Sequence, residues 1–230
     1  MNPIIKDLQE VAKEDKISKF QSFFKTGKGE YGEGDLFIGI SVPETRKVVK
    51  KHKNASLEQI QELLQSKIHE HRLCGLLIMV DQYQKTKENE EIFNFYLKNI
   101  SRVNNWDLVD SSAEKIIGAH IFQKDKKLIY ELVQSKNLWE RRIAIISTFY
   151  FIKKGQFQDT LKIAEILLND DEDLIHKAVG WMLREMGKKG GMEKLIEFLD
   201  KNSQKMPRTM LRYSIEKLDE EQRRRYLNKK

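Results

Sequence analysis

Apolar residues recur at helical spacing along nearly the whole chain, and no segment shows the strict alternation of apolar and polar residues that marks a half-buried strand. Three prolines are spread over 230 residues. Proline breaks the interior of a helix, so a chain this poor in proline is compatible with extensive helix. The pattern predicts an all-α protein.

The predicted helices are separated by short breaks, and two of them carry start signals. Pro43 stands in the first turn of a helix that runs to Lys51. Ser56 and Gln59 form a capping-box pattern for a helix that ends near Ser66. The remaining predicted helices cover residues 5–24, 68–84, 88–99, 105–119, 124–134, 138–154, 157–168, 173–186, 192–201, 207–218 and 219–227.

Pairs of these helices recur at roughly 35–40 residues, which is the spacing of HEAT-like and armadillo-like repeats. Such pairs stack into an α-solenoid with one concave face. No composition shift or linker divides the chain. We therefore expect a single domain over residues 1–230, folded as an α-solenoid of HEAT/armadillo-like repeats.

Composition indicates a soluble protein of a reducing compartment. The single cysteine, Cys74, excludes an internal disulfide and fits the cytoplasm. The amino end carries mixed charge and does not read as a signal peptide, and the apolar run over residues 73–80 is too short to span a membrane. We expect a cytoplasmic protein with no membrane partner.

The net charge of +7 is concentrated toward the carboxyl end, while acidic residues gather at 88–91 and 170–173. A clustered basic end suggests a polyanionic partner, although a solvated helix face explains the charge equally well. The basic residues are Lys188, Lys189, Lys205, Arg208, Arg212, Arg223, Arg224, Arg225, Lys229 and Lys230.

One carboxylate stands where a helix would normally place an apolar residue. Trp106, Asp110, Ala113 and Ile117 fall on one helical stripe that is otherwise apolar. An ionised carboxylate beside an aromatic face is a candidate site for stabilising a cation. The alternatives are a buried carboxylate paired with an arginine of the next repeat, and a tryptophan that only packs in the core. Asp107, at about the second helical position, is expected to compensate the helix dipole.

Four segments together resemble one family. They are residues 24–35, 105–110, 138–142 and 177–185, and they occur in the family's order. The chain resembles the AlkD-type DNA glycosylases, which are HEAT-like repeat enzymes that excise alkylated purines. The resemblance covers nearly the whole length.

The resemblance implies a role for four residues. Asp110 matches the catalytic aspartate of the family, Trp106 and Trp181 match the aromatic residues that line the sugar of the lesion, and Arg142 matches an arginine that contacts the DNA backbone. From the charge pattern, Lys188, Lys189, Arg208 and Arg212 are further candidates for backbone contact. The implied partner is double-stranded DNA that contains alkylated bases, bound by a monomer with no obligate protein partner and no cofactor.

Two alternatives to the glycosylase remain at this point. The chain could be a HEAT-like scaffold that binds DNA or protein without catalysis, or a relative that recognises damage without cutting. The Gly-x-Gly pattern within residues 27–34 follows a helix and lacks the ending of a phosphate-binding loop. His69, His71 and Cys74 lack the spacing of metal ligands, so no metal is expected.

Overall fold

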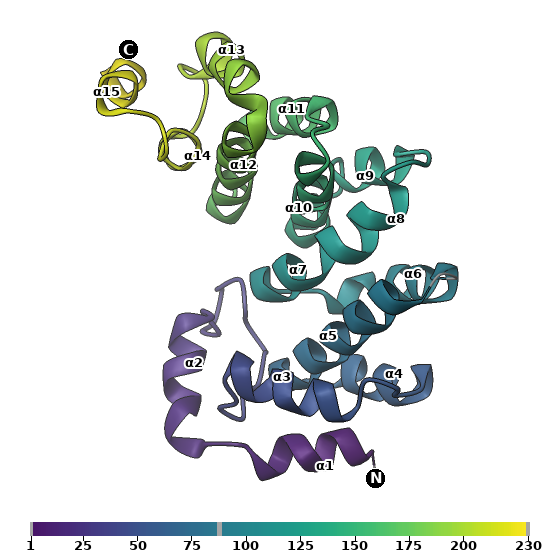
Figure 1. The fold of residues 1–230 in the computed structure, drawn as a ribbon. Coiled ribbons are helices and arrows are strands. Elements are labelled where there is room, and N and C mark those ends of the chain that lie inside the picture. The colour runs from purple at the N-terminus through teal and green to yellow at the C-terminus, as the bar shows by residue number, and fades with distance from the viewer. Residues whose placement is uncertain (1, 87–88, 229–230) are drawn as a thin grey trace. The chain divides into compact units, whose positions relative to one another are not determined.

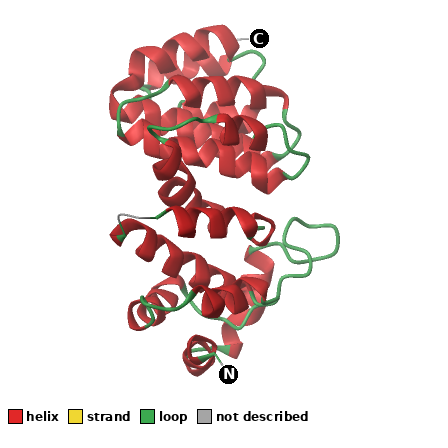
Figure 2. Cartoon of the chain, turned by 90° about the vertical axis from the view of Figure 1, so that its right-hand side faces the viewer, coloured by secondary structure: helices red, strands yellow, loops and turns green. Residues whose placement is uncertain are grey.

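The structure is a computed structural model that describes residues 2–86 and 89–228, and helix is the main secondary structure of these residues (Figure 1). Figure 2 shows helices joined by loops, and within the described ranges the one β feature is an isolated bridge between Leu36 and Ile68. The predicted all-α class is confirmed. Glu88, the expected start of one helix, and the basic residues Lys229 and Lys230 lie outside the described residues.

Contacts divide the chain into two compact units, Met1–Ser112 and Ala113–Lys230. The first unit is built around α5, in which nearly every residue of the first three turns is buried, and α3, α4 and α6 pack on it. Its elements are α1 (Pro3–Glu10), η1 (Glu14–Lys16), α2 (Ile17–Phe23), α3 (Val42–Lys51), α4 (Leu57–Gln65), α5 (His69–Lys85), α6 (Glu90–Lys98), η2 (Ile100–Arg102) and α7 (Trp106–Ala113).

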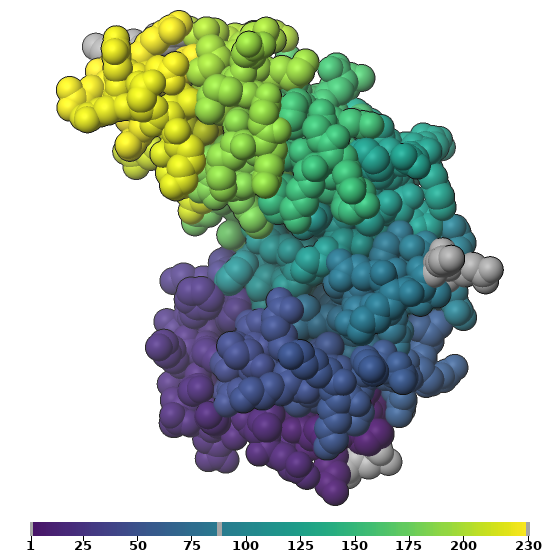
Figure 3. Space-filling model, viewed as in Figure 1, coloured from purple at the N-terminus to yellow at the C-terminus, as the bar shows by residue number. Residues whose placement is uncertain are grey.

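The second unit is built around α10 and α12, which pack on each other and on the helices next to them in the chain. Its elements are η3 (Glu114–Gly118), α8 (Ala119–Ile121), α9 (Lys127–Leu132), α10 (Leu138–Lys153), α11 (Gln158–Ile166), η4 (Leu167–Asn169), α12 (Asp173–Met186), η5 (Gly187–Gly191), α13 (Met192–Asn202), α14 (Arg208–Ser214) and α15 (Glu220–Asn228). In the space-filling view the surface of this unit passes from teal through green to yellow in chain order (Figure 3). Packing of helices on their sequence neighbours is the organisation of a helical-repeat fold, as predicted.

Several predicted helix ends are confirmed because local chemistry sets them. Ser41 and Glu44 form a capping box at the start of α3, and Ser56 and Gln59 form the expected one at the start of α4. The helix predicted over residues 173–186 is α12 with the same bounds.

The helix predicted over residues 5–24 is wrong as one continuous element. The chain breaks after Glu10 into α1, η1 and α2. The reason is a non-local contact: the Lys13 amide donates to the Ile38 carbonyl at 2.9 Å, and a side chain on Gly39 would lie 2.0 Å from the Lys13 carbonyl oxygen. The segment before α3 therefore accepts a hydrogen bond from an amide that a continuous helix would have used.

The helix predicted over residues 105–119 is also not regular. After α7 the backbone widens into one π-helical segment, η3, before α8 continues. At Gly118 the backbone approaches α10 so closely that a Cβ atom would lie 2.2 Å from the Ser147 carbonyl oxygen. Short π-helical segments within α-helices, such as η3, are frequent at functional sites.

Candidate functional site

The start of α7 is fixed by two polar residues. Asn105 is fully buried, and its side-chain oxygen accepts a hydrogen bond from the Trp106 amide at 2.8 Å. Asp107 Oδ1 accepts one from the Leu108 amide at 2.9 Å. These bonds satisfy amides of the first turn that have no partner within a helix, so the helix begins at Trp106.

The Trp106 ring is held in a group of aromatic side chains from the end of α2 and the residue after it. Phe24 stacks on it with ring centroids 5.3 Å apart and planes 16° apart, and Phe23 meets it edge-on at 5.7 Å. Trp106 is half-buried, whereas Phe23 is 61% exposed. An aromatic surface therefore reaches solvent at the start of α7.

Asp110 stands one turn after Trp106 on α7 and is half-buried. Leu108 and Val109, just before it, are completely buried. The helix thus packs one side into the core and holds Asp110 and Trp106 at the boundary with solvent. A carboxylate and an indole ring one helical turn apart are side-chain neighbours.

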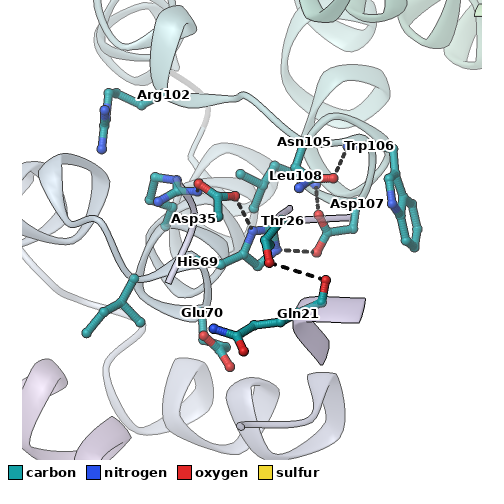
Figure 4. Close-up of polar contacts among 12 residues, drawn as sticks. Gln21, Thr26, Asp35, His69, Glu70, Arg102, Asn105, Trp106, Asp107 and Leu108 are labelled. Carbon is teal, nitrogen blue, oxygen red and sulfur yellow. Dashed lines mark hydrogen bonds and ion pairs between the residues drawn. The ribbon is translucent and has the colours of Figure 1, made fainter. Parts of the chain in front are cut away.

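Beneath this first turn lies a chain of buried charges that joins three segments (Figure 4). Arg72 donates to Asp35 at 2.6 Å, His69 Nδ1 lies 3.2 Å from Asp35, and His69 Nε2 lies 2.8 Å from Asp107. Burial alone would lower the pKa of His69, but the carboxylates of Asp107 and Asp35 raise it to about 9. His69 is therefore an imidazolium at neutral pH, and both of its ring nitrogens donate.

Sequence reasoning missed this charged chain. It gave Asp107 only a helix-dipole role and considered His69 only as a metal ligand. His69 lies 34 residues from Asp35 and 38 residues from Asp107, so no local spacing connects them. The available signal was weak: an acidic residue one position after a tryptophan, and a histidine in the polar first turn of a helix that then becomes apolar.

Trp181, on α12 in the second unit, is half-buried and tilts against Phe149 with ring centroids 5.8 Å apart. The Lys153 ammonium lies 4.3 Å from the centroid of the Phe149 ring and 2.5 Å from a carboxylate oxygen of Glu114. The Lys153 ammonium, paired with the buried Glu114 carboxylate, thus holds the Phe149 ring that Trp181 contacts.

Arg142, on α10, is only 5% exposed. Its Nη1 donates to the Leu174 carbonyl at the start of α12, at 2.5 Å. The guanidinium is therefore mostly enclosed between two helices of the second unit.

The other candidate basic residues lie at the surface of the second unit. Lys188 and Lys189 are exposed on η5, and Lys188 pairs with Glu185 at 2.9 Å. Arg208 and Arg212 are exposed on α14, and Arg208 donates to the Leu227 carbonyl at 3.1 Å. Trp106 and Asp110 thus share the first unit, whereas Trp181, Arg142 and these basic residues belong to the second.

Three further features of the described residues concern metal ligands, membrane-spanning helices and thiol reactivity. Across residues 2–86 and 89–228, no group of three or more His, Cys, Asp or Glu side chains is placed to hold a metal ion. The same residues include no helix long and apolar enough to cross a membrane. Burial raises the pKa of the Cys74 thiol to about 12, which leaves almost no reactive thiolate.

The fold and the first-unit geometry together define a helical-repeat protein with an acidic and aromatic site at the start of one helix. The family model described as DNA alkylation repair enzyme matches residues 4–218, which is most of the chain, so the protein belongs to that family. Membership assigns it to DNA repair, as an enzyme that acts on DNA.

A solved structure has the same fold. It is a predicted DNA alkylation repair enzyme from Enterococcus faecalis, with a TM-score of 0.70 over 91% of this chain and 97% of that chain. The two sequences are 18% identical, a level at which the likeness shows the fold alone. No curated protein matches the sequence.

Proposed function

We propose that the protein is a DNA glycosylase of base excision repair that hydrolyses the N-glycosidic bond of cationic N3- or N7-alkylated purines in duplex DNA. The observation that carries this proposal is the half-buried Asp110 one turn after Trp106, whose ring is held by Phe24. Family membership supplies the DNA substrate and the repair role.

The proposed reaction needs one carboxylate near the sugar and no general acid. Alkylation at N3 or N7 gives the purine a positive charge, so the base leaves without being protonated. The bond between C1′ and the base nitrogen breaks, and its electron pair neutralises the purine. Positive charge then develops on the deoxyribose. Water forms the new C1′–O bond, loses one proton and leaves an abasic site.

Asp110 would act on the sugar in this scheme. A fixed carboxylate stabilises the developing oxocarbenium charge and orients the attacking water. Asp110 is the fifth residue of α7, and the helical stretch continues beyond it through η3 into α8, so it lies nearer the amino end of that stretch, where the helix dipole is positive. Trp106 adds an aromatic face that attracts a cation by about 0.5–2 kcal/mol.

The second unit would bind the lesion and the DNA backbone in this scheme. Trp181 would offer a second aromatic face to the lesion nucleotide. Since Arg142 is only 5% exposed, little of its side chain is open to a phosphate group. The exposed Lys188, Lys189, Arg208 and Arg212 would then carry most of the contact with phosphate.

The test is single-turnover release of 7-methylguanine from methylated duplex DNA by wild type, Asp110→Asn and Asp171→Asn. Asp171 is an exposed acidic residue just before α12. Its substitution changes net charge by the same amount, so it is a matched control. We expect Asp110→Asn to lower the rate by about 10²–10³-fold, the effect typical of losing one group that stabilises transition-state charge, with duplex binding retained. We expect Asp171→Asn to match wild type.

The same assay tests how lesions are distinguished. Discrimination by lesion charge predicts fast release of cationic 7-methylguanine and slow release of neutral hypoxanthine. Comparable rates on both bases would contradict it. Duplex binding without release by wild type would indicate a damage-binding relative, and loss of both would favour a scaffold for proteins.

A further inference from the structure

The buried charges of the first unit form one alternating series. Arg72, Asp35, His69 and Asp107 are 1%, 7%, 1% and 9% exposed, respectively. A buried charge is tolerated only with a partner, and removal of one member leaves its neighbour uncompensated. Every charge in the series has a partner of opposite sign: Asp35 contacts both Arg72 and His69, and Asp107 contacts His69.

The aromatic side chains around His69 tie it to Trp106 by a second route. The His69 ring contacts Phe24 at 4.8 Å and Phe37 at 4.7 Å, and those two rings also stack on each other at 5.1 Å. Phe24 also stacks on Trp106. Phe24 therefore contacts both the imidazolium and the Trp106 ring, and it links the position of one to the position of the other.

The hydrogen bond to Asp107 acts on the helix itself. Asp107 directly follows Trp106 and precedes Asp110 by three residues. A strong contact at this point fixes the rotation of the first turn of α7 about its axis. The positive charge of His69 also offsets the negative charge of Asp107. This weakens the electrostatic repulsion between Asp107 and the Asp110 carboxylate, which lies one turn further along the helix.

We propose that His69 is a positioning residue for the reaction: as an imidazolium held between Asp35 and Asp107, it fixes the first turn of α7 and so aims Trp106 and Asp110 at the lesion. This inference rests on the proposed glycosylase function. The charged groups that face His69 are Asp35 from the segment before α3, Arg72 from its own helix and Asp107 from α7.

The first test compares His69→Gln with a matched control, His71→Gln. His71 is buried on the same helix, but its ring contacts the Ser66 hydroxyl, and burial lowers its pKa to about 4, so it is neutral. We expect His69→Gln to lower the single-turnover rate of 7-methylguanine release by about 10–100-fold, since a displacement of about 1 Å is enough for such a loss. Duplex affinity should stay within about twofold of wild type, and His71→Gln should keep the wild-type rate. An equal loss of rate in the two variants would show that His69 acts only as a core residue and would refute its positioning role.

The second test uses the pH profile, which packing alone would not move. The wild-type rate should fall as the pH rises through about 9, where His69 loses its proton. Asp107→Asn removes the carboxylate that most favours the proton, so this fall should move to lower pH, and in His69→Gln it should be absent. If the rate falls at the same pH in wild type and in Asp107→Asn, the proposal is overturned. This comparison does not depend on the folding of His69→Gln.

A fluorine resonance on Trp106 separates this inference from the proposed function. With 5-fluorotryptophan incorporated and the signal assigned through Trp106→Phe, the Trp106 resonance should titrate near pH 9 in wild type and not in His69→Gln. If the protein excises the base but the Trp106 resonance does not titrate, the positioning role of His69 is overturned and the glycosylase function is retained. Titration without excision would refute the glycosylase, and the catalytic part of this inference with it.

Discussion

Raising the pH from 7 to 10 should destabilise this protein through His69. In the folded state its pKa is raised from the ordinary value of 6.5 to about 9, because Asp107 and Asp35 outweigh the effect of burial. A group whose pKa is higher in the folded state stabilises the fold fully below its unfolded pKa. That stabilisation is lost as the pH rises through the folded pKa. The window for His69 therefore runs from pH 6.5 to about pH 9.

The size of the effect follows from that window. Each pKa unit corresponds to about 1.4 kcal/mol, so the His69 proton contributes about 3 kcal/mol at pH 6. This is a large share of the 5–15 kcal/mol, approximately, by which native proteins are stable. The loss should be almost complete by pH 10.

Urea denaturation at pH 6, 7, 8, 9 and 10 measures this loss in wild type, His69→Gln and His71→Gln. Wild type and His71→Gln should lose about 3 kcal/mol more than His69→Gln between pH 6 and pH 10. Subtracting the His69→Gln curve removes the contributions of lysine and tyrosine, which all three proteins share. Parallel curves for wild type and His69→Gln would refute the charged network.

Two further predictions concern packing away from the site. Cys74, whose thiol pKa burial raises to about 12, should react with a thiol reagent at pH 8 only after denaturation, and rapid labelling of the folded protein would contradict its burial. Gly118→Ala should destabilise the protein by about 1–3 kcal/mol, because the new methyl group would meet the Ser147 carbonyl oxygen at 2.2 Å, and unchanged thermal unfolding would refute this close approach.

The helical architecture was predictable because its signals are local. The capping box at Ser56 and the bounds of α12 follow from residues within one or two turns of each helix end. The break after Glu10 and the π-helical segment η3 were not predictable in this way. The first depends on Ile38 and Gly39, and the second accompanies a close approach of the backbone to α10 at Ser147.

In the candidate site, too, local features were predictable and contacts between distant segments were not. Trp106 and Asp110 were recognised because a carboxylate interrupts an apolar stripe within one helix. The partners of Asp107 and the stack of Phe24 on Trp106 come from segments more than 30 residues away, and no periodicity connects them. The sequence also gave no sign that Arg142 would be enclosed against Leu174.

The central claim is that the alkylated base leaves intact while water takes its place on the sugar. Mass spectrometry of the products from a duplex with a single 7-methylguanine tests this most directly. The account predicts free 7-methylguanine and a strand with one abasic site, formed by wild type and nearly absent with Asp110→Asn. A full-length strand that has lost only its methyl group, or equal release by Asp110→Asn, would contradict it.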